Sequence, residues 1–235
     1  MIGALCLAAV VWAAQDAVTL KRVFVAGEER TLYANLSVES SFGEILVQLD
    51  LREKTLEADG DKATVELALS NLRVKMGDQE MPSNPPQPLR LRMNSQGFVL
   101  NGLPVAVGNN LAFLRYLFVL PGSPLSVGKA VPFAFESSDP SGTKLTGEAA
   151  LLRVSDGNAV VTVRSKLLGP GFSKEMSLAY TAKFDLKTGK LVEADGTVTN
   201  VPALQGMEVT AIQFTIDTKK RDQMKRIYDG SSSSR

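Results

Sequence analysis

The chain has 235 residues, of which 44% are hydrophobic and 22% charged; this is ordinary for a folded soluble protein and too apolar for a disordered one. Its 26 Lys and Arg against 25 Asp and Glu give a net charge of +1, without the positive excess typical of nucleic-acid binders. With no His and one Cys, the chain lacks the residues for Ser-His-Asp or Cys-His nucleophiles, His acid–base catalysis and His- or Cys-ligated zinc.

The first segment is an apolar stretch from Ile2 to Ala14, which is typical of the hydrophobic region of a signal peptide. It is shorter than the ~20 residues that a membrane-spanning helix needs. Small residues at its end suit a cleavage site, although no basic residue precedes it. We predict that residues 1–14 are a signal peptide and that the protein is exported, to the periplasm or beyond. The alternative is a buried N-terminal strand or helix. Cys6 is expected to be removed with the leader.

After this stretch, apolar and polar residues alternate in one segment after another. The apolar positions include Leu32, Ala34, Leu36 and Val38; Ile45, Val47, Leu49 and Leu51; Ala63, Val65, Leu67 and Leu69; and further runs at 131–135, 176–186 and 212–216. This period of two predicts antiparallel strands with one wet face. Hairpin turn sequences separate the runs, at 59–61, 95–97, 156–158 and 187–189. The pattern predicts about eleven strands, many of them longer than average.

One segment of the mature chain is predicted to be a helix. Asn109 or Asn110 is suited to cap it, an apolar run from Leu111 to Leu120 follows, and Pro121 ends it. Arg115 is its only charged residue, so the helix is apolar on all sides and must be buried. The apolar face of the sheet is the natural partner.

The turn and glycine pattern also indicates an internal duplication, with halves at about 20–105 and 122–218. The alternative is that any meander has turns at such intervals. We predict a single β-rich domain over residues 15–218 and a flexible tail over 219–235. The predicted fold class is all-β with one main helix: a curved antiparallel sheet, in the form of a half-barrel or open barrel, with the helix packed on its concave face.

Two groups of aromatic and aliphatic residues are candidates to line a ligand site between this helix and the sheet. They are Phe113, Leu114, Tyr116, Leu117 and Phe118 on the helix, with Phe133 and Phe135 across from them. The alternative is that they fill a dry core. Arg90 and Arg92 are placed either at the rim of such a site or on a solvated strand face.

Several polar combinations invite a catalytic or metal-binding interpretation. They are the acidic pairs Glu28-Glu29 and Glu193/Asp195, the pairs Ser165-Lys166 and Ser173-Lys174, and Asp59 and Asp61 around a turn. The carboxylates occupy wet positions that do not raise a pKa, and adjacent residues of a strand point to opposite faces. The Asp-Gly-Asp sequence is typical of a hairpin turn. We therefore predict no enzymatic activity, no cofactor and no metal site.

The C-terminal stretch begins with five basic residues, Lys219, Lys220, Arg221, Lys225 and Arg226, against Asp222 and Asp229. A basic tail of this kind is able to touch anionic lipid or a cell-wall polymer. A solvated, disordered end is the alternative.

The stretch Leu120-Pro121-Gly122-Ser123-Pro124-Leu125-Ser126-Val127-Gly128 is similar to a junction, LP-x-x-P followed by V-x-V-G, in a large set of exported bacterial proteins of unknown function. In those proteins a helix ends there and a strand begins. The set often has an aromatic residue after the Gly, where this chain has Val131-Pro132-Phe133.

More distantly, the predicted plan resembles the periplasmic lipoprotein-carrier fold of the LolA/LolB and LppX type. That resemblance is one of architecture; it implies the carriage of acyl chains in a half-barrel but transfers no site residue.

Together these patterns predict a non-enzymatic, exported protein of the cell envelope that binds or carries an apolar or amphiphilic, lipid-like ligand between residues 110–120 and the sheet. The alternative is a structural or protein-interaction module of the envelope with a filled core and a protein partner. Nucleic acid is not an expected partner.

Overall fold

The computed structural model of the protein describes residues 17–101, 114, 116, 119–137, 142–169, 174–202 and 207–219. These residues form an all-β fold of twelve strands, which confirms the predicted class. In chain order the strands are β1 (Glu29–Ser40), β2 (Gly43–Asp59), β3 (Lys62–Met76), β4 (Gln79–Met81), β5 (Leu89–Asn94), β6 (Val99–Asn101), β7 (Ala130–Glu136), β8 (Lys144–Ser155), β9 (Asn158–Leu168), β10 (Met176–Asp185), β11 (Leu191–Thr199) and β12 (Val209–Asp217).

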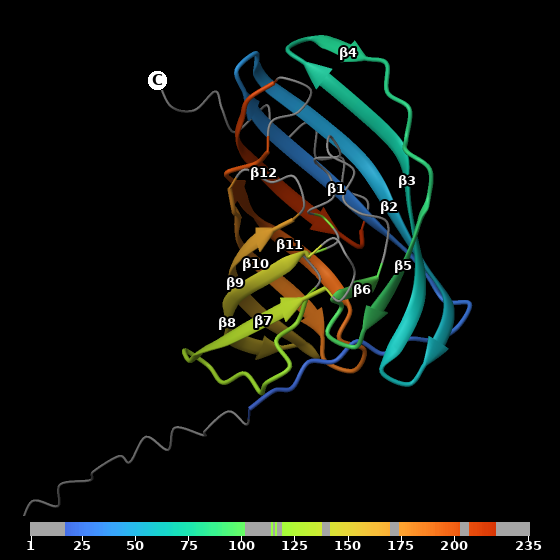
Figure 1. Ribbon diagram of the computed structural model, residues 1–235, viewed down its shortest axis with the longest axis vertical. Helices are drawn as coiled ribbons and strands as arrows, with labels where there is room; N and C mark the ends of the chain where they lie inside the picture. The colour runs from blue at the N-terminus through green and yellow to red at the C-terminus, as the bar shows by residue number, and fades with distance from the viewer. Residues whose placement is uncertain are drawn as a thin grey trace, which may run out of the picture.

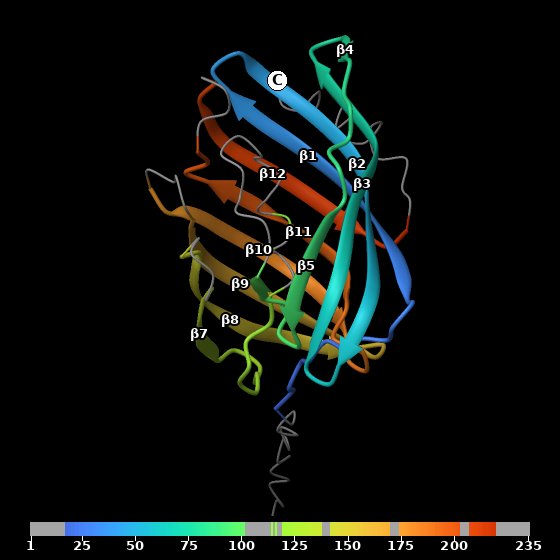
Figure 2. The same cartoon turned by 45° about the vertical axis from the view of Figure 1, so that its right-hand side comes forward.

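All the strands belong to one antiparallel sheet, ordered β6-β5-β3-β2-β1-β12-β11-β10-β9-β8-β7, with β4 paired to β3. The first and last strands meet in the middle of this order, where Tyr33 of β1 lies opposite Asp217 of β12. As a result β6 and β7, which are neighbours in sequence, form the two outer edges. Within the described residues β6 and β7 are not paired, so the sheet is open, and Figures 1 and 2 show it strongly curled.

The alternating sequence pattern accounts for the two faces of the sheet. Leu36 of β1 lies between Val47 of β2 and Phe214 of β12, and all three side chains point to the same side. We call this side the inward face and the opposite side the outward face. The four predicted turn sequences connect β2 to β3, β5 to β6, β8 to β9 and β10 to β11, and a glycine in each has a positive φ.

Two glycines lie where neighbouring strands of the C-terminal half approach each other too closely for a side chain. A Cβ on Gly196 of β11 would stand 2.4 Å from the carbonyl oxygen of Ala179, and one on Gly147 of β8 would stand 2.4 Å from that of Arg164. Both glycines have inward-facing cross-strand partners, Tyr180 and Ser165. Glycine inside a strand is typical of such close approaches and of bends in curved sheets.

Parts of the predicted organisation fall outside the described residues. These include the predicted signal peptide 1–14, the tail from residue 220 onward and most of the predicted helix over 110–120. At Leu114 and Tyr116 the backbone has a 3₁₀ conformation. The halves proposed as duplicates correspond to β1–β6 and β7–β12, but a duplication is not shown by this strand order. Among the described residues, no helix has the length and apolar character that crossing a membrane would require.

Candidate functional site

The inward face of the curled sheet is apolar and deeply buried. Its side chains come from all the long strands and include Leu32, Leu36, Leu49, Val65, Leu91, Val161, Val163, Leu178, Phe214 and Ile216. Leu20, Leu114, Tyr116, Val119, Leu120 and Leu125, from outside the sheet, belong to the same buried cluster. Apart from polar positions such as Arg30, Glu53 and Ser165, the concave side of the sheet therefore carries one continuous apolar cluster.

Aromatic side chains bridge the two unpaired edges of the sheet. Phe98, just before β6, stacks on Phe135 of β7 with ring centroids 5.1 Å apart. Phe133 lies 6.0 Å from Phe135, and Tyr116 lies 6.4 Å from Phe98. The Ser137 hydroxyl donates a hydrogen bond of 3.3 Å to the carbonyl of Leu100. We call Phe98, Tyr116, Phe133 and Phe135 the aromatic seam.

The seam contains three of the residues predicted to line a ligand site. Tyr116, Phe133 and Phe135 come together there, and Leu114 lies in the same buried cluster. Phe113, Leu117 and Phe118 lie outside the described residues. Phe98, which is 2% exposed and lies at the centre of the seam, was not among the predicted residues. Its position directly after the 95–97 turn, at the start of a strand, is the sequence feature that indicates it.

A segment before the first strand crosses one end of the curled sheet. Residues 18–25, here called the N-terminal strap, exchange two backbone hydrogen bonds between Val18 and Leu125. The Arg22 amide donates to the Ser95 carbonyl in the turn before β6, and the Val23 amide donates to the Thr188 carbonyl in the turn between β10 and β11. The strap thus ties the two wings of the sheet together. Leu20 and Arg22 are buried, whereas Lys21 and Val23 are exposed.

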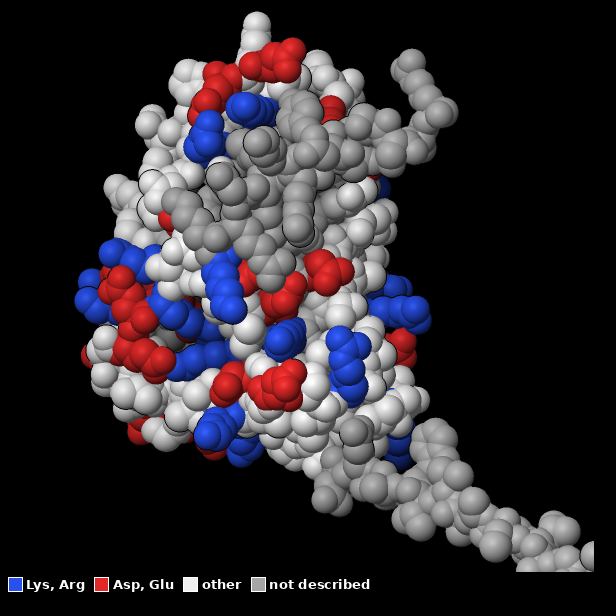
Figure 3. Space-filling model, turned by 180° about the vertical axis from the view of Figure 1, so that it is seen from behind, with Lys and Arg blue, Asp and Glu red and all other residues white. Residues whose placement is uncertain are grey.

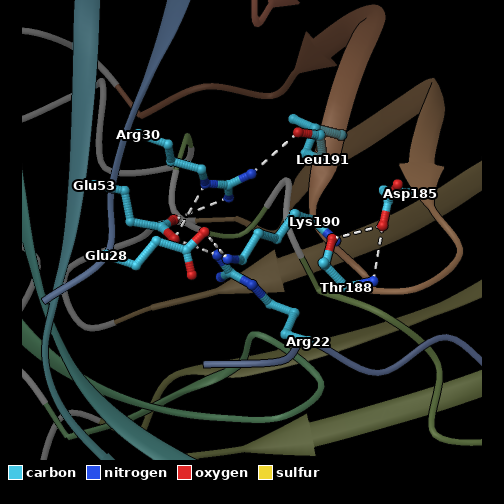
Figure 4. Close-up of polar contacts among 8 residues, drawn as sticks. All are labelled: Arg22, Glu28, Arg30, Glu53, Asp185, Thr188, Lys190 and Leu191. Atoms are coloured by element: carbon cyan, nitrogen blue, oxygen red, sulfur yellow. Dashed lines mark hydrogen bonds and ion pairs between the residues drawn. The ribbon is translucent and has the colours of Figure 1, made fainter. Parts of the chain in front are cut away.

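Beneath the strap lies a buried cluster of three charged residues, Arg22, Arg30 and Glu53 (Figure 4). Arg30 of β1 holds Glu53 of β2 with two hydrogen bonds, Nε to Oε1 at 3.2 Å and Nη2 to Oε2 at 3.1 Å. Nη2 of Arg22 donates to the same Oε1 at 2.6 Å. The Arg22 and Glu53 side chains are 1% and 5% exposed, so both charges are held away from water.

The two arginines differ in how completely their donors are used. Nη1 of Arg30 donates to the Leu191 carbonyl at 3.0 Å. Nη1 of Arg22 reaches only the Met93 sulfur at 3.6 Å, and within the described structure the buried Nε of Arg22 has no hydrogen-bond partner. The Arg22 guanidinium lies over the Phe24 ring, 5.4 Å from its centre, which compensates part of its charge.

Burial and charge act in opposite directions on the Glu53 carboxyl. Burial alone would raise its pKa, but the positive charges of Arg22 and then Arg30, with their hydrogen bonds, lower the pKa to about 2. Burial lowers the pKa of Arg30, and the attraction of Glu53 opposes that effect. Glu53 is therefore ionised at any physiological pH.

A second ion pair borders the cluster. Lys190, in the turn between β10 and β11, pairs with Glu28, which is one of the sequence-predicted acidic residues (Figure 4). Asp185 is engaged by its own turn, since its Oδ1 accepts from the Thr188 hydroxyl at 2.8 Å, and this bond lowers the Asp185 pKa. Glu28 is therefore part of a structural charge network.

The remaining polar candidates of the sequence are not brought together. Glu193 and Asp195 lie on the outward face of β11, and Ser165 is buried while Lys166 is exposed. Arg90 pairs with Glu66 on the outward face. Ser173 lies outside the described residues. Across the part of the chain that the structure describes, no group of three acidic or sulfur-bearing side chains could hold a metal ion.

Three adjoining hollows lined by described residues lie on the outward face of the C-terminal half. The first, of about 540 Å³, is bordered by Lys166, Ala179 and Thr197. The others measure about 420 and 340 Å³, meet at Asp195 and Gly196, and continue the depression towards β1 and β2. Small and hydroxyl-bearing side chains such as Ala150, Ala179 and Thr197 leave this face hollowed.

On one face of the molecule, described side chains of both charges are mixed (Figure 3). Figure 3 shows Lys and Arg side chains interspersed with Asp and Glu on the face seen from behind the view of Figure 1. Exposed ion pairs in the structure include Arg73 with Glu80 and Arg164 with Glu148. The described residues on this face therefore form no basic stripe of the kind expected of a nucleic-acid-binding surface (Figure 3).

The alternation of the strands also indicates the buried cluster, although Arg30 and Glu53 were not predicted from it. Arg30 continues the alternation of Leu32 and Ala34, and Glu53 continues that of Leu49 and Leu51, so both charged residues occupy inward positions. A charge in the apolar phase of a strand predicts a buried ion pair.

The chain matches no protein-family model, and no curated protein matches it.

Proposed function

We propose that this protein is a non-enzymatic, exported binding or carrier protein for an apolar or amphiphilic ligand, which it holds against the inward face of the sheet. The observation that carries the proposal is the open seam. Neighbouring strands in the order of the sheet are joined by backbone hydrogen bonds. Between the outermost strands, β6 and β7, the described residues show no strand pairing, but they do show aromatic contacts and a hydrogen bond from the Ser137 hydroxyl.

We infer that the sheet parts more easily at the seam than between two of its long strands. Separating two aromatic rings costs about 0.5–1.5 kcal/mol per pair beyond the cost of the apolar area that it exposes. A hydrogen bond such as that of Ser137 adds about 0.5–1.5 kcal/mol. Parting two long strands elsewhere would break a full ladder, such as the one that joins β1 to β2 from Glu29 to Ser40. An apolar chain that enters through the seam reaches the continuous apolar cluster directly.

The proposal includes the finer features expected from the sequence. We infer that residues 110–120 form an apolar helix on the concave face, and that the two halves arose by duplication. Two observations support these ideas. Leu114, Tyr116, Val119 and Leu120 are all buried in the core cluster, and each half of the chain forms one meander that runs between the centre and an edge of the sheet. The architectural resemblance to LolA/LolB and LppX-type carriers points to the same class of ligand.

Extraction of the natively purified protein tests this function. The mature chain is isolated without detergent and analysed by native mass spectrometry, and its organic extract is analysed for lipids. We expect about one amphiphile per chain and rebinding of a dansyl-labelled fatty acid after delipidation. The variant Phe98→Ala at the seam should change the rate of rebinding, whereas Phe42→Ala, at the exposed tip between β1 and β2, should not. A chain that carries no lipid and binds no labelled fatty acid would contradict the proposal.

The outward hollows favour a second candidate, a protein-interaction module of the envelope. A partner seated there would contact Ala179, Thr197 and Lys166 rather than the inward face. The double variant Ala179→Arg/Thr197→Arg would fill the hollow and abolish capture of such a partner, while leaving the binding of the labelled fatty acid unchanged.

A further inference from the structure

The charge network under the strap contains more positive than negative charge. Arg22, Arg30 and Lys190 face the two carboxylates of Glu28 and Glu53. Lys190 pairs with Glu28, and the Arg30 fork occupies both oxygens of Glu53. Arg22 therefore has no carboxylate of its own: it bonds only to Oε1 of Glu53, which also accepts a hydrogen bond from Arg30.

Arg22 is also the residue with an unused buried donor. Its side chain is 1% exposed, its Nε has no hydrogen-bond partner in the described structure, and its Nη1 has only a thioether. Unsatisfied donors on a buried charge are rare in native proteins, because neither water nor protein compensates them. An ordered water or an anion is the kind of group that would satisfy this donor.

The position of Arg22 connects this donor to the apolar face. Arg22 shares the inward side of the strap with Leu20, and it contacts Met93, which lies on the inward face of β5 and is fully buried. Phe24, on the same side of the strap, packs against the guanidinium. The unused Nε therefore lies where the apolar surface ends against the strap.

We propose that Arg22 anchors the anionic head group, a carboxylate or a phosphate, of an amphiphile whose apolar chain lies along the inward face. This inference rests on the proposed function and specifies its ligand. Arg22 binds the head group through its free Nε, while its Nη2 stays paired with Glu53, whose two oxygens Arg30 also holds. A guanidinium suits this role because it stays charged when buried and offers several donors in one plane.

Isothermal titration calorimetry on the delipidated mature chain tests the assignment at neutral pH. The ligands are laurate, lauryl phosphate and lauryl alcohol, which share one alkyl chain and differ in head group. The variants are Arg22→Met, which keeps the apolar stem, Arg22→Lys, which keeps the charge, and Lys21→Met as the control on the exposed side of the strap. The ratio of anion to alcohol affinity in each protein cancels any general weakening of binding.

The native chain and Lys21→Met should bind at least one of the anions about tenfold or more tightly than the alcohol. Arg22→Met should bring that ratio close to one, and Arg22→Lys should retain part of it. Whether laurate or the phosphate binds more tightly identifies the head group.

If the native chain binds the anions and the alcohol equally, this inference is overturned but the proposed function is not, and a water occupies the site at Nε. An affinity ratio that is unchanged in Arg22→Met has the same meaning. If Arg22→Met does not fold, the affinity ratio of the native chain still tests the inference, because equal binding of anion and alcohol overturns it. Failure of all three ligands to bind overturns the proposed function, and this inference with it.

Discussion

At the scale of single residues, the buried charges are the least expected feature of this molecule. Most of its inward positions are aliphatic or aromatic, yet Arg30 and Glu53 occupy the same phase of their strands. Burying a charge is unfavourable unless partners replace the lost water, and here two guanidiniums surround one carboxylate. The sequence was sufficient to place Arg30 and Glu53 inward. It was not sufficient to bring Arg22 to them, because the strap has no strand pattern of its own.

Removal of the shared carboxylate should be costly. Glu53→Gln leaves two buried arginines without a counter-charge, so we expect the free energy of unfolding to fall by about 3–5 kcal/mol. Urea denaturation followed by circular dichroism measures it. The matched control is Glu29→Gln, which removes an exposed carboxylate 3.8 Å from Arg52 and should change stability by less than about 0.5 kcal/mol. Similar small effects for both variants would show that Glu53 is not held as described.

The lowered pKa of Glu53 makes stability depend on acidity. The unfolded chain protonates this carboxyl near pH 4.5 and the folded chain only near about 2. The cluster therefore contributes fully above pH 4.5, and its contribution is lost as the pH falls towards 2. The loss over this window is about 3 kcal/mol for a shift of this size. Unfolding free energies of the native chain and Glu53→Gln, measured across the window, should converge as the pH falls; a constant difference would contradict the assignment.

At the scale of elements, the strands and turns were the predictable part. Alternation marks a half-buried strand whatever it pairs with, and hairpin turn sequences identify themselves locally, so all four predicted turns were found. The strands β4 and β6 are too short to show a period of two. All three residues of β4 are exposed, so β4 has no alternation of apolar and polar positions. The aromatic seam was only half predictable, because Phe98 and Phe135 are brought together by the curl of the whole sheet.

Two glycines of the C-terminal half lie where neighbouring strands leave no room for a side chain. Gly196→Ala places a methyl group against the Ala179 carbonyl and the Tyr180 Cβ, both at 2.4 Å. We expect a loss of about 1–3 kcal/mol in unfolding free energy, the usual effect of overpacking. Gly122→Ala is the matched control, since its Cβ would meet only the Gln96 side chain, at 3.7 Å or beyond. Thermal unfolding followed by circular dichroism compares the two, and an equal response would argue against the close approach.

At the scale of the whole molecule, the pairing of the first strand with the last one decides the architecture. No local signal in the sequence reveals that β1 lies beside β12, because antiparallel pairing needs only a compatible apolar face. This contact joins the two meanders into one sheet and leaves the seam between β6 and β7. The open shape was predicted from composition and pattern, but the place of the opening follows only from this long-range pairing.

One continuous sheet with one buried cluster should unfold as one unit. We expect a single transition in urea, with coincident curves from far-ultraviolet circular dichroism and from the near-ultraviolet signal of buried tyrosines such as Tyr180. Two separated transitions would show instead that the meanders β1–β6 and β7–β12 are independent.

The central claim is that the inward face, reached through the aromatic seam, binds an amphiphile. Photo-crosslinking tests it most directly, because neighbouring residues of a strand point to opposite faces and labelled positions therefore identify the face. The delipidated protein is irradiated with a diazirine-bearing fatty acid, and the modified residues are mapped by mass spectrometry. The account predicts labels on inward residues such as Met93, Phe98 and Phe135. Labels on Ala179, Thr197 or Lys166 in the outward hollows, or no labels at all, would contradict it.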